Sequence, residues 1–339
     1  MIVMLSMRRS PGVGEFSDLL EKGAQDDVEY RYFSWPEALR GRYDVLHVHW
    51  PELLVRDSRG RGRAFLRRRL MDALLLVLRV RGIPLVRTFH NPRPHERGDA
   101  AEVRALDRID AATRLWIALN GTTRPEGDVD VVLIPHGHYA EVFASFPQPA
   151  AVPGRVTFFG IIRPYKNVEE LIAAFRGLDD PALSLRIAGR AHPGQEERVH
   201  AAAGDDPRIG LALRYLDDAD LVREVREASL VVLPYREMHN SGALLVAASL
   251  GRPVLVPHSG ANALLADELG HGWVRMYRGA LTPEVLAAQL AAVAAEGLLS
   301  SEGPDIAARD AARIGALHAR AYRRARGERI EEEADVRVG

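Results

Sequence analysis

Residues 158–175 read FFGIIRPYKNVEELIAAF, and residues 230–260 read LVVLPYREMHNSGALLVAASLGRPVLVPHSG. In each stretch, an apolar run of strand length leads into a polar loop and then into an apolar pattern of helical period. Strands that alternate with helices in this way indicate βαβ units and a parallel sheet. The two stretches therefore predict an α/β domain whose ligands bind in the loops that follow the strands.

The loop of the first stretch carries two cations beside the start of a helix. We expect the strand to end at Gly160, with Arg163 and Lys166 following it and a helix beginning near Asn167. Asn167 is a good N-cap, and Glu170 three residues later predicts a capping box. Cations beside a helix N-terminus suit a diphosphate whose negative charge grows as it leaves.

An ordinary surface position is the alternative for any basic residue, but composition argues against it for Lys166. Of the 45 basic residues only Lys22 and Lys166 are lysines, so a generic surface cation in this chain would be arginine. A compact ammonium acts as a point charge, unlike the planar fork of arginine.

The second stretch offers backbone donors to an anion. Pro234 ends the strand, and Ser241 is a natural N-cap for the next helix. The N–H groups of Ser241, Gly242 and Ala243 would then be free to bind a phosphate, and Gly242 permits close approach of the backbone.

These two stretches resemble the corresponding segments of the family 4 glycosyltransferases. The resemblance implies the GT-B fold, in which two Rossmann-like, doubly wound α/β domains face a cleft. It gives Arg163 and Lys166 the roles of binding the donor diphosphate and helping it depart, although the family arginine usually follows the glycine directly. The implied donor-binding residues are Gly12, Gly14, Gly160, Arg163, Lys166, Asn240, Ser241, Gly242 and Ala243.

The resemblance weakens toward the nucleotide ribose. Glu237 stands one residue out of register with the family's acidic residue, which contacts the donor sugar and is a candidate catalytic group. Where the family often has a second glutamate that grips the ribose, this chain has Val246. Either the ribose is held in another way or the loop is rebuilt.

The first half of the chain repeats the alternation of strands and helices. Strands are expected at residues 2–6, 28–33, 44–48, 84–89, 114–119 and 129–134. Gly12 and Gly14 follow the first of these strands, where tight backbone approach to a phosphate is possible. His90 opens the loop after the fourth, and the resemblance implies that it touches the donor sugar near the reacting carbon; a loop-capping role is the alternative.

Glu52 and His138 are the candidate acceptor-binding residues, with a surface charge as the alternative for Glu52. His47 and His49 share one face of a strand. For His47 we expect a satisfied hydrogen bond in the core rather than a metal ligand, and we assign no metal site.

The domain boundary is expected in residues 146–154, FPQPAAVPG, which contain three prolines and no periodicity. This division predicts an acceptor-binding domain at residues 1–150 and a nucleotide-sugar-binding domain at residues 151–326 that includes a C-terminal helix. Strands of the second domain are expected at residues 155–160, 184–188, 209–213, 230–234 and 254–257. Residues 327–339 are polar and predict a disordered tail.

Composition excludes several classes of protein. A net charge of −1 gives no reason to expect nucleic acid as a partner, and the absence of cysteine excludes disulfides and thiolate sites. Residues 1–7 are typical of a first strand and not of a signal peptide, and no run of 18 apolar residues predicts a membrane span.

Residues 61–81, RGRAFLRRRLMDALLLVLRVR, allow two interpretations. A basic amphipathic helix of this kind could lie on an anionic membrane. The alternative, which we favour for the apolar part, is a crossover helix that buries Leu74, Leu75 and Leu78 against the sheet and exposes its arginines. For the cluster Arg67–Arg69, membrane association stays a hypothesis.

The sequence thus predicts a metal-independent hexosyltransferase without a cofactor. Its co-substrate would be a GDP- or UDP-linked sugar, and its acceptor a saccharide or lipid-linked saccharide. The resemblance implies retention of the anomeric configuration and a role in polysaccharide or glycoconjugate synthesis. We expect a cytoplasmic protein, with contact at the inner face of the membrane left open. A non-catalytic sugar-nucleotide-binding protein and another GT-B enzyme, such as an epimerase, remain as alternatives.

Overall fold

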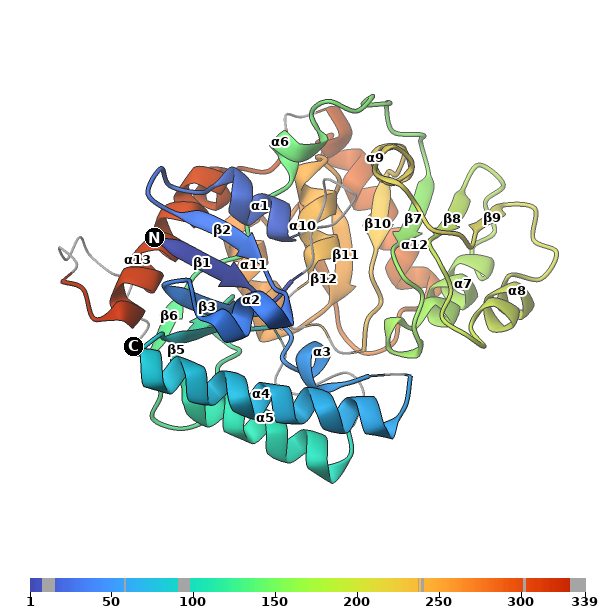
Figure 1. The fold of residues 1–339 in the computed structure, drawn as a ribbon. Helices are drawn as coiled ribbons and strands as arrows, with labels where there is room; N and C mark the ends of the chain where they lie inside the picture. The colour runs from blue at the N-terminus through green and yellow to red at the C-terminus, as the bar shows by residue number, and fades with distance from the viewer. Residues whose placement is uncertain are drawn as a thin grey trace. The chain divides into compact units, whose positions relative to one another are not determined.

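The computed structural model describes residues 1–7, 16–57, 59–90, 98–236, 238, 241–300 and 303–329. Contacts between residues divide the chain into two compact units. Unit 1 contains the first six strands and the C-terminal helix, whereas unit 2 runs from His138 to Ala308. Each unit is built on a six-stranded parallel sheet (Figure 1). The predicted pair of doubly wound α/β domains is therefore confirmed.

The sheet of unit 1 has the strand order β2-β1-β3-β4-β5-β6. Its strands are β1 (Ile2–Leu5), β2 (Glu29–Tyr32), β3 (Val45–Val48), β4 (Leu85–Phe89), β5 (Thr113–Ala118) and β6 (Val131–Leu133). The strand order reverses between β1 and β3, and ligands of doubly wound sheets bind at such a reversal, beyond the carboxyl ends of the strands. The segment after β3 that contains Glu52 lies at this position.

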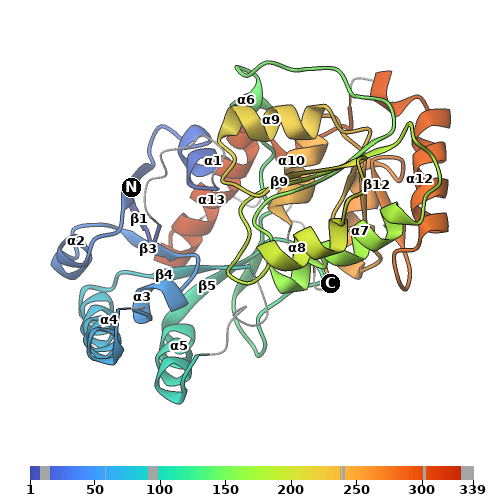
Figure 2. The ribbon, with the colours of Figure 1, turned by 90° about the vertical axis from the view of Figure 1, so that its right-hand side faces the viewer.

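Helices cover both faces of this sheet. Its helices are α1 (Phe16–Lys22), α2 (Trp35–Arg40), α3 (Glu52–Val55), α4 (Arg61–Arg81), α5 (Ala100–Ala112) and α13 (Ala311–Arg326). Because successive strand side chains point to opposite faces, Val3 and Leu5 pack toward α13, whereas Met4 packs toward α4 and α5. Helices α4 and α5 lie side by side as one outer layer (Figures 1 and 2).

The C-terminal helix α13 belongs to unit 1, although the sequence analysis assigned it to the second domain. Its Tyr322 is fully buried among the side chains of β1, β3 and β4. Two glycines let α13 approach the end of α1, since a Cβ on Gly315 would lie 1.5 Å from the carbonyl oxygen of Gly23. This packing joins segments about 290 residues apart, and no local sequence pattern reports it.

The sheet of unit 2 has the order β12-β11-β10-β7-β8-β9. Its strands are β7 (Arg155–Phe159), β8 (Ser184–Ala188), β9 (Ile209–Ala212), β10 (Leu230–Val232), β11 (Val254–Pro257) and β12 (Val274–Tyr277). The order reverses between β7 and β10, so the loops after these two strands flank the expected ligand position. The sequence analysis predicted the first five strands and missed β12.

Helices also cover both faces of the second sheet. They are α6 (Ala140–Phe143), α7 (Val168–Arg176), α8 (Glu196–Ala203), α9 (Asp218–Arg226), α10 (Gly242–Ser249), α11 (Gly260–Leu269) and α12 (Pro283–Ala295). Short 3-10 turns are η1 (Pro164–Lys166), η2 (Leu298–Ser300) and η3 (Ala307–Arg309). Helices α7 and α8 lie against each other, on the opposite side of the sheet from α9 and α10 (Figure 2).

Residues 146–154, the expected linker, are part of unit 2. Val152 fixes this segment, because its N–H donates to the carbonyl of Glu227 at 2.9 Å and its carbonyl accepts from the Ser229 hydroxyl at 2.8 Å. The chain instead passes between the units at residues 137–138 and 308–309.

Candidate active site

The loops after β7 and β8 meet through two glycines at the carboxyl edge of the second sheet. Gly160 and Gly189 have φ values of 103° and 144°, which favour glycine. The Gly160 N–H donates to the carbonyl of Ala188 at 2.9 Å, and a Cβ on Gly189 would lie 2.1 Å from the Gly160 carbonyl oxygen. The loop that starts at Gly160 is thereby held directly over the strand ends.

Lys166 ends the short turn η1 and lies among aromatic rings. Its Nζ is 4.8 Å from the ring centroid of Tyr235, which follows β10, and 5.9 Å from that of Phe158 on β7. Burial, and then the charge of Arg163, lower the pKa of Lys166 to about 8. The ammonium is therefore mostly protonated at neutral pH, and among the described residues no carboxylate forms an ion pair with it. A desolvated cation in this state is suited to an incoming anion.

Asn167 does not form the predicted capping box, and that expectation was wrong. The residue adopts the left-handed conformation, with φ 55°, and its side chain makes no cap hydrogen bond. Its amide nitrogen donates instead to the carboxylate of Glu170, and its amide oxygen accepts from Arg236 at 3.0 Å. Glu170 also accepts from the N–H of Leu281 at 2.6 Å. These hydrogen bonds replace the local cap. They tie the end of the Lys166 loop to the loop after β10, through Arg236, and to the segment before α12, through Leu281.

Helix α10 starts after β10 as the sequence predicted. Ser241 is its N-cap, and the serine hydroxyl accepts from the N–H of Leu244 at 3.2 Å. Gly242 and Ala243 form the first turn, where backbone N–H groups lack partners within the helix. Val246, at the position where the family often has glutamate, is buried in the same helix.

Four predicted site residues lie outside the described residues: Gly12, Gly14, Glu237 and Asn240. Their roles in binding the donor stay predictions. Within the described part of the loop after β10, Arg236 is fixed by its N–H, which donates to the Tyr165 carbonyl at 2.9 Å.

Histidines gather at the carboxyl edge of the first sheet. His47 is fully buried, with Nδ1 2.9 Å from the Tyr322 hydroxyl and Nε2 2.8 Å from the Thr88 hydroxyl. The expectation of a satisfied core histidine is therefore confirmed. His49 continues the row, with Nδ1 3.1 Å from Nε2 of His90.

His90 is held as a neutral imidazole. Its ring stacks on Trp50 at 4.4 Å between centroids and 15° between planes. Burial, followed by the charges of His136 and Arg87, lowers the pKa of His90 to about 3. At neutral pH it can therefore exchange hydrogen bonds with a hydroxyl without carrying a charge.

The two proposed acceptor-binding residues fall in different units. Glu52 is the first residue of α3, directly beyond β3. Burial lowers the pKa of Arg87, and the negative charge of Glu52 acts in the opposite direction and raises it. His138 is buried in unit 2, and its Nδ1 accepts from the N–H of Ala140 at 3.1 Å. Glu52 thus lies at the edge of the sheet where ligands bind, whereas His138 supports the start of α6.

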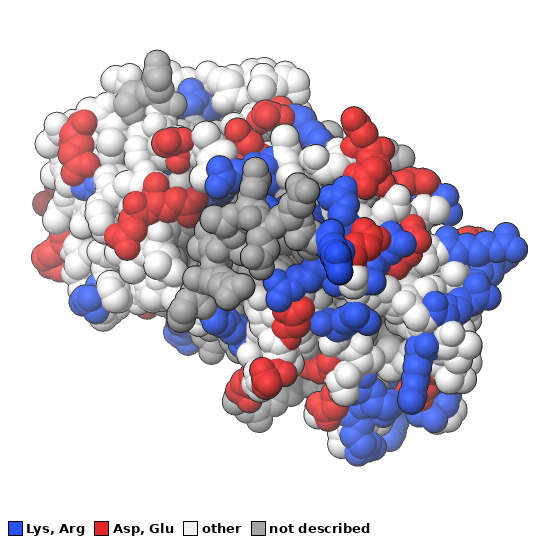
Figure 3. Space-filling view, turned by 90° about the vertical axis from the view of Figure 1, so that its left-hand side faces the viewer, with Lys and Arg blue, Asp and Glu red and all other residues white. Residues whose placement is uncertain are grey.

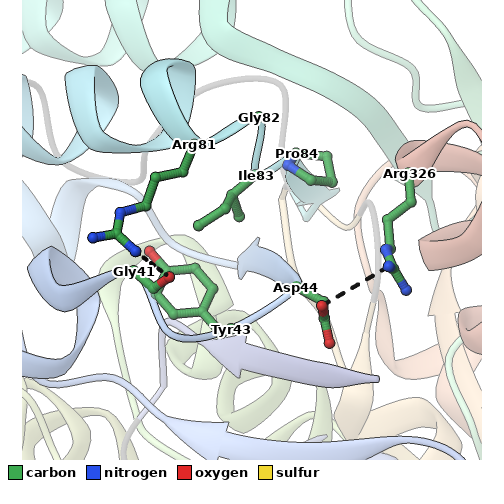
Figure 4. Close-up of a pocket in the computed structure, with 8 residues that line it drawn as sticks. All are labelled: Gly41, Tyr43, Asp44, Arg81, Gly82, Ile83, Pro84 and Arg326. Atoms are coloured by element: carbon green, nitrogen blue, oxygen red, sulfur yellow. Dashed lines mark hydrogen bonds and ion pairs between the residues drawn. The ribbon is translucent and has the colours of Figure 1, made fainter.

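A pocket of about 490 Å³ lies at the other edge of the first sheet (Figure 4). Gly41, Asp44, Arg81 and Arg326 line it, beside the residues that precede β3 and β4. Arg81 donates to the Gly41 carbonyl at 3.4 Å, and Arg326 is 3.9 Å from Asp44. Because this pocket lies at the amino ends of the strands, we do not assign substrate to it.

Comparison with known proteins identifies the family. The family profile described as "Glycosyl transferases group 1" matches residues 153–296. A relative from Xanthomonas campestris pv. campestris is 47% identical over 306 residues, which are 89% of this chain and 86% of the relative. It is named GDP-mannose:glycolipid 4-beta-D-mannosyltransferase. The chain belongs to the group 1 glycosyltransferases. It is a hexosyltransferase.

Solved structures agree with this fold. HepE of Anabaena, in complex with UDP, has a TM-score of 0.60 at 14% identity, with 95% of each chain covered. MnaA of S. aureus, also solved with UDP, has a TM-score of 0.58 at 14% identity, with 98% of each chain covered. At this identity the likeness shows the GT-B fold alone, which the sequence analysis predicted.

Sequence reasoning missed the residues that support Lys166. Tyr235 was taken only as part of a strand-terminating loop, and Arg236 was not considered. An aromatic residue after a strand-ending proline is a weak signal, because its ring can turn to either side of the sheet. Only the folded structure brings the Tyr235 ring against the ammonium of Lys166.

Proposed function

We propose that this glycosyltransferase moves a mannosyl group from GDP-mannose to a hydroxyl of a glycolipid. The main support for this function is the 47% identity to the X. campestris enzyme named GDP-mannose:glycolipid 4-beta-D-mannosyltransferase, which covers 89% of this chain and 86% of that enzyme. Unit 2 would bind the donor and unit 1 the acceptor. This choice replaces the broader GDP- or UDP-linked donor that the sequence allowed.

In unit 2, the chain would supply positive charge at the place where GDP departs from the donor. Lys166 and Arg163 follow the strand end at Gly160, and the first N–H groups of α10 follow β10. Fixed cations and N–H dipoles in a water-poor site favour the transition state, in which the leaving diphosphate gains negative charge. We assign the residue roles on this basis: Lys166 assists departure, and Arg163, Ser241, Gly242 and Ala243 hold the diphosphate.

The linkage named for the relative favours inversion over the retention that the family resemblance implied. Mannose is α-linked in GDP-mannose, so a β-linked product requires a single displacement at the anomeric carbon. The bond from that carbon to the phosphate oxygen breaks as the bond to the acceptor oxygen forms. The acceptor proton must go to a base.

Two side chains at the carboxyl edge of unit 1 could serve the acceptor hydroxyl, Glu52 and His90. The low pKa of His90 makes it a weak base, although it remains a good hydrogen-bonding partner. We therefore assign proton acceptance to Glu52 and orientation of the reacting sugars to His90.

The acceptor also indicates where the enzyme works. A glycolipid presents its sugar at a lipid surface, so we propose action at the cytoplasmic face of the membrane. None of the described helices combines the length and apolar character that crossing a bilayer requires.

A ligand panel followed by product analysis tests the proposal. Thermal unfolding with GDP, UDP, GDP-mannose and UDP-glucose should show the largest stabilisation by the guanine nucleotides, because stabilisation grows with ligand concentration over Kd. The product from GDP-mannose and a lipid-linked saccharide should show a β-mannosidic linkage by NMR. Selective stabilisation by UDP would overturn the donor, and an α-linked product would overturn inversion.

A further inference from the structure

Helix α4 carries apolar side chains on two opposite faces. Its inner face buries Ala64, Met71, Leu74 and Leu78 in the core beneath it. Four further apolar residues are exposed on the outside: Phe65 at 62%, Leu66 at 57%, Leu76 at 62% and Val80 at 77%. A surface helix of a globular protein normally presents polar residues there. The crossover-helix interpretation therefore explains the inner face but not the outer one.

The four exposed side chains form one stripe. With 3.6 residues per turn, Phe65, Leu76 and Val80 lie within about 60° of one another around the helix axis, and Leu66 lies at the edge of the same sector. The stripe runs about 22 Å along the helix, at 1.5 Å per residue. We call these four residues the apolar stripe of α4.

Arginines flank the apolar stripe. Helix α4 contains seven arginines and a single acidic residue, Asp72. Arg69 lies within the stripe, with its guanidinium 5.6 Å from the ring centroid of Phe65, and pairs with Asp72, which also pairs with Arg108 of α5. Arg67 and Arg68, in the cluster for which the sequence suggested membrane contact, pair instead with Asp57 and Asp99 away from the stripe. Arg61 and Arg79 border one side of the stripe, and Arg63 and Arg81 the other, by helical position. Figure 3 views the molecule from the left-hand side of Figure 1, where Lys and Arg side chains are exposed together with Asp and Glu.

The neighbouring helix α5 provides an internal comparison. It lies in the same layer and exposes one large apolar side chain, Val103, at 49%. Its charges are mixed, with three acidic residues and two arginines along 13 residues. Position in the outer layer therefore does not by itself produce an apolar stripe with cationic edges.

We propose that the apolar stripe of α4 and its flanking arginines dock the enzyme on an anionic lipid surface, an inference that rests on the proposed glycolipid acceptor. Phe65, Leu66, Leu76 and Val80 enter the interfacial region, and the arginines bind phosphate groups of the lipid heads. Apolar residues bordered by cations are the pattern of helices that lie in the plane of a membrane.

Charge complementarity selects lipid over a second copy of the chain. A symmetric dimer through this face would place the same patch on both sides of the interface. The arginines of one copy would then oppose those of the other, which like-charge repulsion disfavours. An anionic bilayer would neutralise the flanking arginines at both ends of the helix.

The test is flotation of the full-length chain with vesicles, without donor or acceptor. Vesicles of 30% phosphatidylglycerol in phosphatidylcholine are compared with phosphatidylcholine alone, at low and at high salt. The stripe variant changes Phe65, Leu66, Leu76 and Val80 to Gln, and the control variant is Val103→Gln on α5. A third variant changes Arg61, Arg63 and Arg79 to Gln. Thermal unfolding without vesicles checks that each variant folds.

We expect the wild type and Val103→Gln to bind the anionic vesicles at least tenfold more tightly than the neutral ones. The stripe variant should lose at least tenfold in affinity, and the arginine variant should lose most of its salt dependence. Equal binding by the wild type and the folded stripe variant would overturn the proposal. So would a wild-type dimer in sedimentation that the stripe variant converts to a monomer.

Activity on a short-chain, water-soluble acceptor separates this inference from the proposed function. Docking variants should transfer mannose to that acceptor at the wild-type rate and lose activity only on acceptor embedded in vesicles. Failure of the wild type to transfer mannose to any acceptor would instead contradict the proposed function, whatever the flotation result.

Discussion

The two units share a parallel six-stranded sheet but differ in what they place at its carboxyl edge. Unit 2 holds Lys166 as a desolvated cation against the ring of Tyr235, in the loop after β10. Unit 1 holds His47 and His49 as buried imidazoles and His90 as a half-buried one, and desolvation keeps all three neutral. The same architecture therefore places a cation at the edge of one sheet, which we propose binds a diphosphate, and neutral imidazoles at the edge of the other, of which we propose that His90 contacts the sugar hydroxyls.

The family profile also distinguishes the two units. It matches residues 153–296, which lie wholly within unit 2. A diphosphate is common to many donors, and its binding needs few features, mainly cations and free N–H groups. Acceptors vary more, so the chemistry of unit 1 has to be argued from its own residues.

The largest expected effect of a change in unit 1 comes from Glu52→Gln. If Glu52 accepts the acceptor proton, kcat should fall about 10²–10⁴-fold, the usual contribution of a general base. The KM for GDP-mannose should change little, because the donor is proposed to bind in unit 2. Steady-state measurement of kcat and of the KM for GDP-mannose would show whether kcat falls while KM stays the same.

His90→Gln serves as the matched variant for Glu52→Gln. An orienting role predicts a smaller fall in kcat for His90→Gln than for Glu52→Gln. The reverse order, in folded proteins, would move the base from Glu52 to His90.

The second prediction concerns acid stability, which should distinguish the units. Burial lowers the pKa of His318 to about 4, whereas an unfolded histidine titrates near 6.5. The unfolded chain therefore binds more protons below pH 6.5, and the free energy of unfolding falls as the pH drops from about 6.5 to 4. This one group should contribute about 2 kcal/mol of that loss by pH 5.

Hydrogen exchange at pH 7.5 and pH 5, corrected for intrinsic rates, measures this difference. Segments of β3, β4 and α13 should lose protection at pH 5 to a greater extent than β7 and β10. His318→Gln should reduce the pH dependence in unit 1, and His200→Gln on the exposed face of α8 should not. Equal loss of protection in both units would contradict the role given to buried histidines.

A smaller effect is expected at Asn167. Asn167→Gly keeps the left-handed backbone and removes the bonds to Glu170 and Arg236, whereas Asn167→Ala adds backbone strain of about 1 kcal/mol. The Asn167→Ala variant should therefore unfold at a lower denaturant concentration than the Asn167→Gly variant. Both variants should lower kcat a few-fold, because they loosen the Lys166 loop. Equal stability of the two variants would show that the left-handed conformation is not required.

The sequence predicted the parts of the fold that local periodicity controls. The strands and loops around Gly160, Lys166 and Ser241 follow from apolar runs, turn residues and a capping serine. The signals around Gly160 and Lys166 all lie in residues 158–175, and those around Ser241 all lie in residues 230–260, so each set is local to one stretch of the chain.

Long-range packing decided what the sequence analysis missed. Helix α13 joined unit 1 because Tyr322 meets His47 and Gly315 meets Gly23, contacts that no local pattern encodes. The side-chain oxygen of Asn167 accepts from Arg236, which is 69 residues away, instead of capping its own helix. The outer stripe of α4 was also hidden, because apolar residues all around a helix do not reveal which of them are covered.

The measurement that tests the account most directly is kcat for mannosyl transfer by Lys166→Ala, with Lys22→Ala as the control at the chain's other lysine. Removing one preorganised group that stabilises developing charge should lower kcat about 10²–10³-fold. We predict that loss for Lys166→Ala, together with weaker binding of GDP, and a rate within about twofold of wild type for Lys22→Ala. A folded Lys166→Ala enzyme with nearly wild-type kcat would contradict the assignment of Lys166 to the departing diphosphate.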